Sequence, residues 1–219
     1  MIDENKKYEL LKDDTITTPS GKTLYRIKAL VAIGLLVAPG ELGGYIETEK
    51  NLSMYGDAWV FGDAWVSGDA QVFGDAQVFG NAWVSGNAWV YGNAWVYGNA
   101  WVYGNAWVYG DALVSGDARV SGDARVSGDA LVYGNAQVSG NAQVKARYDI
   151  QWFSNVGSEN GTLTVCKAKR GLFVSRGCFS GTLPQFKKAV KAKHGDSKIG
   201  RHYATLIQSI EIWFGEERE

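Results

Sequence analysis

A six-residue repeat runs without interruption through the middle of this 219-residue chain. Glycine recurs at every sixth position from Gly56 to Gly140, fifteen times in all. Each glycine is followed by Asp or Asn, then Ala, a variable residue, Val and a second variable residue. A period of six fits no helical repeat, and a glycine with a β-branched valine in every hexad opposes a helix. The repeat therefore restricts this region to a stack of short strands.

Each hexad predicts one short strand and one corner. Side chains alternate across a strand, so Ala and Val point to one side and the two variable residues to the other. The Gly-Asn or Gly-Asp pair turns the chain, because these residues accept a positive φ. Three hexads close a triangle, so fifteen hexads make five coils that lie about 4.8 Å apart. The narrow interior suits Ala and Val but not Trp, which must face outward.

The pattern Val-x-Gly-Asn/Asp-Ala-x resembles the hexapeptide repeat of left-handed β-helix proteins, whose best-known members are acyltransferases that trimerise. The chain also resembles a Trp-rich subgroup common in phages and prophages, often labelled acyltransferases or polymer-forming proteins on the repeat alone. The left hand and the trimer are implied by the resemblance, not by the spacing. The residues outside the repeat that carry it are Leu42-Gly43-Gly44-Tyr45-Ile46-Glu47, Asn51-Leu52-Ser53, Gly177-Cys178-Phe179-Ser180-Gly181-Thr182-Leu183 and His194-Gly195-Asp196.

The predicted fold is mainly β: a left-handed parallel β-helix of about five 18-residue coils, with an N-terminal β cap and a small C-terminal α+β module. We place these three parts at residues 1–49, 50–145 and 146–219. In the cap, strands are expected at Thr23–Leu30 and Val31–Val37, followed by a Pro39-Gly40 turn. Residues 44–55 are expected to form two degenerate hexads, with Ile46 and Leu52 at the Ala position.

The C-terminal residues lose the period and predict a hairpin followed by two helices. Thr162–Ala168 and Gly171–Arg176 form the expected hairpin around Lys169-Arg170. Thr182-Leu183-Pro184-Gln185 predicts a capping box that begins a helix through Lys193. A second helix is expected from Ser197 to about Phe214, where apolar residues recur at helical spacing.

Charge, hydropathy and cysteine content argue against a membrane-spanning protein and against a disulfide-rich or cysteine-ligated metal protein. Basic and acidic residues number 7 and 8 in residues 1–55, 3 and 8 in 56–145, and 12 and 7 in 146–219. The basic C-terminal part is compatible with an anionic partner or with a solvated face. The N-terminus is polar, and the longest apolar run, Ala29 to Ala38, is too short to span a bilayer. Cys166 and Cys178 make neither a disulfide framework nor a metal site, so we expect a cytoplasmic protein.

The sequence carries no clear signature of an enzyme. Acyl transfer in the hexapeptide-repeat family uses a histidine near a cleft between subunits, often beside a loop that interrupts the coils. Here no loop interrupts the repeat, and the two histidines, His194 and His202, lie in the C-terminal module. The related carbonic anhydrases need three metal-binding histidines, which excludes that activity. We therefore expect no cofactor, no metal and no catalytic residue, and keep acyl transfer through His194 or His202 as an alternative.

The corner residues allow two interpretations. One residue from each coil is expected to stack along the same corner, about 4.8 Å from the next, where carboxylates repel one another unless they are screened or bridged. A cation could bridge them, but water-exposed ladders of hydrogen bonds are the favoured explanation. The stacked residues of this corner are Asp57, Asp75, Asn93, Asp111 and Asp129.

Aromatic residues gather on the outer surface of all three faces. Exposed apolar patches of this size are rarely bare in a soluble monomer, so we expect a homo-oligomer, with the trimer favoured by the resemblance. Face one carries Trp59, Phe61, Phe79, Trp95, Tyr97 and Tyr133; face two carries Trp65, Trp83, Trp101 and Tyr103; face three carries Phe73, Trp89, Tyr91, Trp107 and Tyr109. The expected oligomer interface contains Trp59, Phe61, Phe79, Trp95, Tyr97, Trp89 and Tyr91.

Two arginines sit one coil beyond the most aromatic coil and suggest a ligand site. Aromatic rings stack on planar groups, and arginine complements phosphate. The hypothesis is a non-catalytic binding protein of phage type that sequesters a nucleotide-like host signalling molecule or blocks a host defence protein, without a membrane or a long nucleic acid as partner. A purely structural column is a further alternative. The expected ligand-binding residues are Trp101, Tyr103, Trp107, Tyr109, Arg119 and Arg125.

Overall fold

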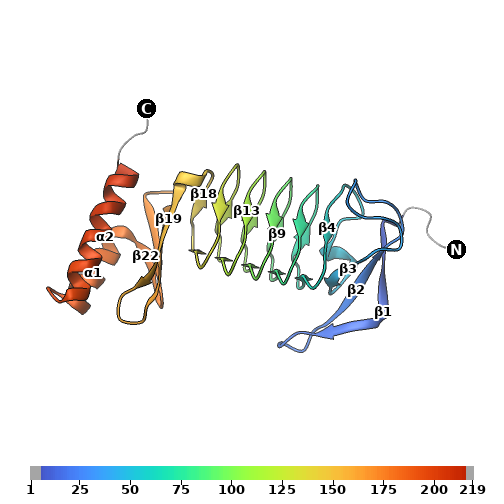
Figure 1. Cartoon of the computed structure of the whole chain (residues 1–219), viewed down its shortest axis with the longest axis horizontal. Helices are drawn as coiled ribbons and strands as arrows, with labels where there is room; N and C mark the ends of the chain where they lie inside the picture. The colour runs from blue at the N-terminus through green and yellow to red at the C-terminus, as the bar shows by residue number, and fades with distance from the viewer. Residues whose placement is uncertain (1–5, 216–219) are drawn as a thin grey trace.

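A column of parallel coils forms the centre of the computed structural model, which describes residues 6–215 (Figure 1). Fifteen two-residue strands build the column, and each pairs in parallel with the strand three places further along the chain. The predicted parallel β-helix is confirmed, and its left hand stays a prediction. Face one contains β4 (Trp59–Val60), β7 (Gln77–Val78), β10 (Trp95–Val96), β13 (Leu113–Val114) and β16 (Leu131–Val132). Face two contains β5 (Trp65–Val66), β8 (Trp83–Val84), β11 (Trp101–Val102), β14 (Arg119–Val120) and β17 (Gln137–Val138); face three contains β6 (Gln71–Val72), β9 (Trp89–Val90), β12 (Trp107–Val108), β15 (Arg125–Val126) and β18 (Gln143–Val144).

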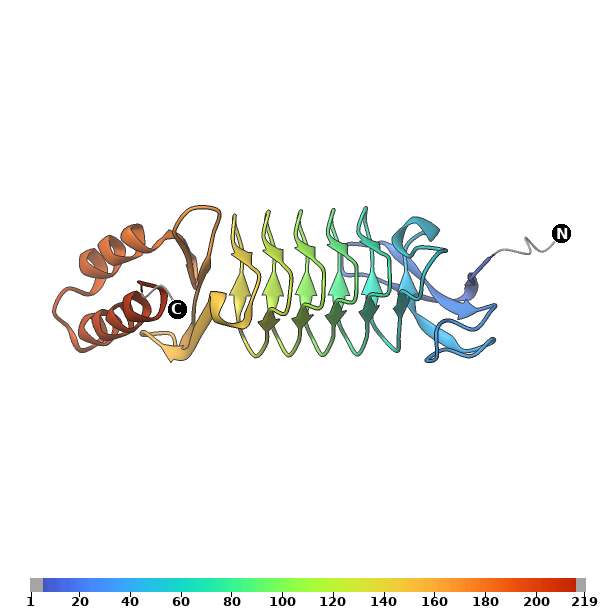
Figure 2. The ribbon, with the colours of Figure 1, turned by 90° about the horizontal axis from the view of Figure 1, so that it is seen from above.

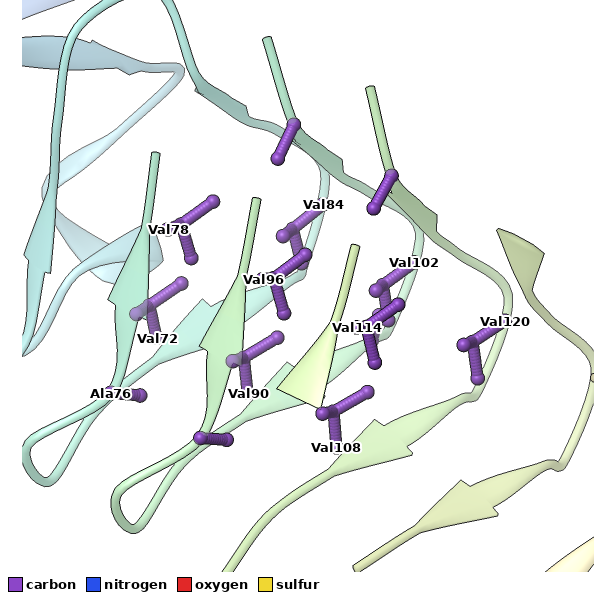
Figure 3. Packing of buried hydrophobic residues seen from close by; sticks show 14 of the residues in the cluster. Val72, Ala76, Val78, Val84, Val90, Val96, Val102, Val108, Val114 and Val120 are labelled. Carbon is purple, nitrogen blue, oxygen red and sulfur yellow. The ribbon is translucent and has the colours of Figure 1, made fainter. Parts of the chain in front are cut away.

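Ala and Val fill the interior of the hexad coils, as predicted. Every Ala and Val at the two inward positions, from Ala58 to Val144, has no exposed surface. Figure 3 shows the valines of successive coils stacked one above another. Burying a Val side chain contributes about 1.5–3 kcal/mol, and a close-packed interior tolerates little change in volume. The inward positions therefore explain why the repeat is so regular.

The corners require glycine for two reasons. The hexad glycines have φ values from +58° at Gly62 to +73° at Gly104, a region that side chains with a Cβ disfavour. A Cβ added to Gly104 would also lie 3.0 Å from the backbone nitrogen of Gly122 in the next coil. The fixed spacing of glycine therefore follows from both the turn and the stacking of coils.

Side-chain hydrogen bonds join Asn to Asp in neighbouring coils along the corners, as the favoured interpretation expects for part of each ladder. Nδ2 of Asn93 donates to Oδ1 of Asp111 at 2.9 Å. The amide separates the carboxylate from the coil above it and supplies a donor instead of a repelling charge. Within residues 6–215, no three His, Cys, Asp or Glu side chains are grouped so that they could hold a metal ion. The same 2.9 Å bond joins Asn99 to Asp117 and Asn105 to Asp123.

Three antiparallel strands cover the N-terminal end. β1 (Tyr8–Thr17) pairs with β2 (Thr23–Ala29), β2 pairs with β3 (Leu42–Ile46), and β3 then pairs in parallel with β5 to extend face two. The strand expected at Thr23–Leu30 is confirmed by β2, whereas β1 was not expected. The strand expected at Val31–Val37 is wrong, because Ile33 and Val37 bond to each other across a tight turn.

An irregular coil precedes the hexads, but its register differs from the expected one. Ile46 pairs with Val66 and Leu52 with Val72, so both occupy the Val position and not the Ala position. Gly44 takes the Ala position beside Ile46, and a Cβ there would lie 2.5 Å from the carbonyl oxygen of Ala64. The 3-10 helix η1 (Glu49–Asn51) forms the corner between Ile46 and Leu52, which are six residues apart like Val66 and Val72. The two extra residues of this coil follow Leu52, which lies eight residues before Val60. The column therefore has about six turns, one more than the hexads provide.

At the N-terminal end of the column, side chains donate hydrogen bonds to backbone carbonyl oxygens that have no preceding coil to bond to. In the column, the carbonyl oxygens at the Ala position accept hydrogen bonds from the coil before. At the open end, Nζ of buried Lys7 donates to the carbonyl oxygen of Ala58 at 2.8 Å and to that of Gly56 at 3.2 Å. Nδ2 of Asn51 donates to the carbonyl of Ala70 at 2.8 Å. Lys7 and Asn51 thus terminate the stack by replacing backbone donors.

The free energy of unfolding is expected to depend on pH through Lys7. Burial lowers the pKa of Lys7 to about 8, against the opposing charges of Asp57 and Asp75. Between about pH 8 and pH 10 the unfolded chain holds a proton that the folded chain has released, so stability rises with pH. Compared with Lys7→Met, the unchanged protein should gain about 2 kcal/mol between pH 7.5 and 9.5 in urea denaturation. The exposed Lys12→Met variant is the control, and a Lys7→Met curve parallel to that of the unchanged protein would contradict this prediction.

The other end of the column is closed by acceptors. After the turn η2 (Arg147–Asp149), Oδ2 of buried Asp149 accepts hydrogen bonds from the backbone nitrogens of Lys145 and Ala146 at 2.9 and 3.1 Å. Oγ1 of Thr164, which is fully buried, accepts from the nitrogen of Gln137 at 2.9 Å. The N–H groups of Gln137 and Lys145 would donate to a following coil if one existed, so the two ends of the column carry complementary backbone groups.

A four-stranded antiparallel sheet and two helices form the C-terminal module (Figure 2). One side of the sheet, with Cys166 and Phe173, packs on the column, and the other packs on the helices. The predicted hairpin and both predicted helices are confirmed. The strands are β19 (Ile150–Val156), β20 (Gly161–Lys167), β21 (Leu172–Arg176) and β22 (Phe179–Thr182), and the helices are α1 (Leu183–His194) and α2 (Lys198–Gly215).

Local chemistry accounts for the start of α1 and the packing of both helices. Thr182 is the N-cap, and its side chain and that of Gln185 form the predicted capping box. Phe186 and Val190 of α1 and Ile207 and Ile210 of α2 are buried in the cluster between the helices and the sheet. Within the described residues, neither helix is both long enough and apolar enough to cross a membrane.

Candidate functional site

Stacked aromatic rings form columns on the outer faces. On face three, the rings of Phe73, Tyr91 and Tyr109 occupy the same position in successive coils. Their centroids are 4.7 and 4.9 Å apart, and their planes differ by only 3° and 2°. The repeat of the coils sets this spacing, because each ring is carried by a strand paired with the next. Burial raises the pKa of Tyr91; Tyr109 adds to this effect and Arg125 opposes it.

Two tryptophan columns end at an arginine. On face three, Trp89 stacks on Trp107 at 5.2 Å and 6°, and the guanidinium carbon of Arg125 lies 4.5 Å from the centroid of Trp107. On face two, Trp101 meets the tryptophan above it edge-on, and the guanidinium of Arg119 lies 5.0 Å from its centroid. In-register pairing of β11 with β14 and of β12 with β15 places each arginine under its tryptophan. Such cation–π contacts hold the guanidinium and leave its N–H edge free for an anion.

The structure divides the six expected ligand-binding residues into two groups. Trp101, Tyr103 and Arg119 lie on face two, and Trp107, Tyr109 and Arg125 lie on face three, on either side of the corner at Gly104 and Asn105. Trp101, Tyr103 and both arginines are exposed, whereas Trp107 and Tyr109 are half-buried by stacking. The two groups therefore present two neighbouring surfaces.

The expected interface is altered at one position. Trp59 is only 1% exposed, because the N-terminal strands cover it and Tyr8 packs edge-on against it at 6.0 Å. Trp59 belongs to the interior of the capped end and cannot contact another subunit there. Trp95 is 44% exposed and remains available. The other expected interface residues, Phe61, Phe79, Tyr97, Trp89 and Tyr91, are half-buried.

The two histidines lie apart from the aromatic columns. His194 ends α1, where its ring lies 5.6 Å from that of Tyr203, and His202 is exposed on α2. His194, Arg176 and Cys178 line a cavity of about 360 Å³ that the sequence did not predict. Arg176 and Cys178 flank Gly177 in a short turn, and no periodicity marks them. Two signals were present in the sequence: the basic character of this part of the chain, and the segments beginning at Gly177 and at His194, which carry the resemblance.

These features define the chain as a parallel β-helix repeat protein with both ends of its column covered. A protein-family model described as the YdcK beta solenoid repeat matches residues 70–86, 76–92, 84–98, 88–104, 94–110, 106–122, 118–134 and 124–140. All the matches lie within the regular hexads, so the chain is similar to this family in its column. The comparison with curated proteins gives no match.

Proposed function

We propose that this protein is a non-catalytic binding protein of phage or prophage type, which assembles into an oligomer and captures a nucleotide-like anion in the cytoplasm of a bacterial host. The observation that carries the proposal is the pair of arginines, Arg119 and Arg125, each stacked on a tryptophan. A guanidinium held in this way can bind phosphate through two parallel hydrogen bonds. The tyrosines beside it, Tyr103 and Tyr109, supply apolar surface for a base or ribose.

Self-association is the second part of the proposal. Trp95 has 44% of its surface exposed, the other expected interface rings apart from Trp59 are half-buried, and aromatic residues of this kind are enriched in the centres of interfaces. Two columns that pack side by side would cover these rings and create a groove beside the arginines. The resemblance to hexapeptide-repeat proteins favours three columns around an axis. A purely structural column would need the same contacts but no ligand.

Variants at the arginines test the ligand proposal directly. Native mass spectrometry of gently purified protein gives the number of subunits and any adduct mass, and calorimetry with nucleoside phosphates and cyclic dinucleotides follows. We expect Trp107→Ala and Arg119→Ala each to weaken binding about tenfold, since stacking on one base contributes about 1–3 kcal/mol, and to leave the oligomer unchanged. Arg125→Lys should also bind weakly, because it keeps the charge but loses the planar fork.

The matched controls are Gln137→Ala and Gln143→Ala. These glutamines occupy the positions of Arg119 and Arg125 one coil further along the column. Normal binding by Trp107→Ala and Arg119→Ala, or no saturable nucleotide binding by the unchanged protein, would exclude the proposed site. Turnover of an acyl thioester that is lost in His194→Ala or His202→Ala would instead support the acyltransferase alternative.

A further inference from the structure

A concave site lies in the C-terminal module, away from the aromatic columns. Its volume is about 360 Å³, and its walls come from the turn after β19, the turn between β21 and β22, helix α1 and Tyr203 of α2. Pockets of this size hold small organic molecules. The walls join segments that are distant in sequence, so the cavity exists only in the folded module.

The polar wall of the cavity is cationic. Arg176 and Lys193 line it together with His194, and Glu159 is the acidic residue among the lining side chains. The side chain of Arg176 is only 9% exposed, and that of Glu159 is 74% exposed. Their closest contact is 3.9 Å, which is a weak ion pair in solvent.

Arg176 at this wall does not use all of its hydrogen-bond donors. One terminal nitrogen donates to the carbonyl oxygen of Val156, but the buried Nε has no hydrogen-bond partner among the described residues. A buried donor without an acceptor is unfavourable, and an unpaired guanidinium even more so. A bound anion at this wall would compensate the charge.

Much of the remaining lining is apolar. Phe179 and Phe186 lie with their ring centroids 5.3 Å apart, and Val190 and Ala189 of α1 continue the same surface. Aromatic rings and small aliphatic groups side by side fit a flat apolar group. The cavity therefore combines a cationic wall with an apolar wall.

We propose that this cavity binds a small organic anion, a carboxylate or a phosphate monoester that carries a flat apolar group. The anionic head would lie against Arg176 and Lys193, and the apolar part against Phe179 and Phe186. The site is separate from the arginines of faces two and three and does not depend on the function proposed for them.

Cys178 provides a built-in reporter, because it is exposed and lines the cavity. The other cysteine of the chain, Cys166, is buried, and burial with the added charge of Asp149 raises the pKa of Cys166 to about 12. Iodoacetate and iodoacetamide alkylate a thiolate in the same way: the sulfur–carbon bond forms, iodide leaves and the thiol proton goes to solvent. Only iodoacetate is an anion. The ratio of the two rates at Cys178, measured by mass spectrometry on the full chain, reports attraction of anions to the cavity.

We expect this ratio to exceed that of free glutathione and to fall about fivefold in Arg176→Gln and in Lys193→Gln, as for loss of one charge at close range. Lys191→Gln is the matched control, since it removes the same charge from the same helix outside the cavity. Lys193→Gln keeps the test valid if Arg176→Gln unfolds. A ratio equal to that of glutathione, or equal in all variants, would overturn the proposal.

Protection experiments test the ligand class. Benzoate and phenyl phosphate should each slow the alkylation of Cys178 by iodoacetamide, whereas neutral benzyl alcohol should not. Equal protection by all three compounds would show a merely apolar pocket and overturn the proposal. Arg125→Ala should leave the protection by benzoate unchanged, so failure here is distinguishable from failure of the nucleotide site.

Discussion

Deleting residues 93–110, one complete coil, should leave a folded and cooperative protein, whereas deleting only residues 95–97 should not. The longer deletion joins Gly92 to Asp111, so each remaining Ala and Val still points inward. Each remaining strand still pairs with a strand of the same face, with Val beside Val. The shorter deletion removes Trp95, Val96 and Tyr97 and leaves one coil with two sides. The coils below it then lose their register with the coils above it.

The physical reason is that stability in a repeat protein is close to a sum of coil terms and contacts between neighbouring coils. Removing one coil removes the contribution of that coil and of one contact between neighbouring coils. Removing half a hexad disrupts the strand pairing between the two halves of the column. We expect the short deletion to lower the free energy of unfolding by at least about 4 kcal/mol, a size typical of severe core disruption. Circular dichroism melts and urea denaturation of the two variants measure this. Similar melting of both deletions would refute the argument.

A third deletion serves as the control for length. Removing residues 111–116, one hexad, keeps the inward pattern but moves Arg119 from face two to face one, where it would replace Leu113 beneath Trp95. This variant should fold almost as well as the 18-residue deletion. It should bind nucleotides less well, because Arg125 would then lie beneath Trp101 and Leu131 beneath Trp107, so that only one arginine–tryptophan pair remains on faces two and three.

The regular hexads explain why so much of the column could be predicted. In a hexad such as Ala100-Trp101-Val102-Tyr103, local alternation alone decides which side chains point inward, and the period decides which faces they share. The same logic failed at residues 44–55, because two extra residues between Leu52 and Val60 shift Ile46 and Leu52 from the Ala position to the Val position. Degenerate repeats carry too few inward residues to define the register.

The remaining differences arise from contacts that are distant in sequence. Trp59 has the same hexad context as Trp65, yet Tyr8 buries it from a strand about fifty residues earlier. The cavity beside Arg176 also depends on Glu159, Lys193 and Tyr203. These four residues lie on four different segments of the chain. No local pattern in the sequence marks such convergence. The arginine–tryptophan pairs, by contrast, were predictable, because the 18-residue coil places Arg119 beneath Trp101.

Two complementary truncations should form a one-to-one complex. A chain of residues 56–219 lacks the N-terminal strands and exposes Trp59 and the carbonyl oxygens of Ala58 and Val60. A chain of residues 1–145 lacks the C-terminal module and exposes the N–H groups of its last coil, including that of Gln137, which otherwise donates to Thr164. The two open ends match, because the hexad order continues from Lys145 to Gly56 without a change of period.

Mixing the two truncated chains should therefore continue the column from one molecule into the other, with the last strands of the first pairing in parallel with β4, β5 and β6 of the second. Size-exclusion chromatography with light scattering should give the summed mass of the two chains. If the intact protein is an oligomer, the complex should have that summed mass multiplied by the number of subunits. Neither truncated chain should bind the intact protein, whose ends are closed by Lys7 and Asn51 at one side and by Asp149 and Thr164 at the other. If each truncated chain associates with itself as readily as with the other, the open ends associate nonspecifically. Preferential pairing would instead demonstrate that the polarity of the backbone groups, and not exposed apolar surface alone, determines how this column must be terminated.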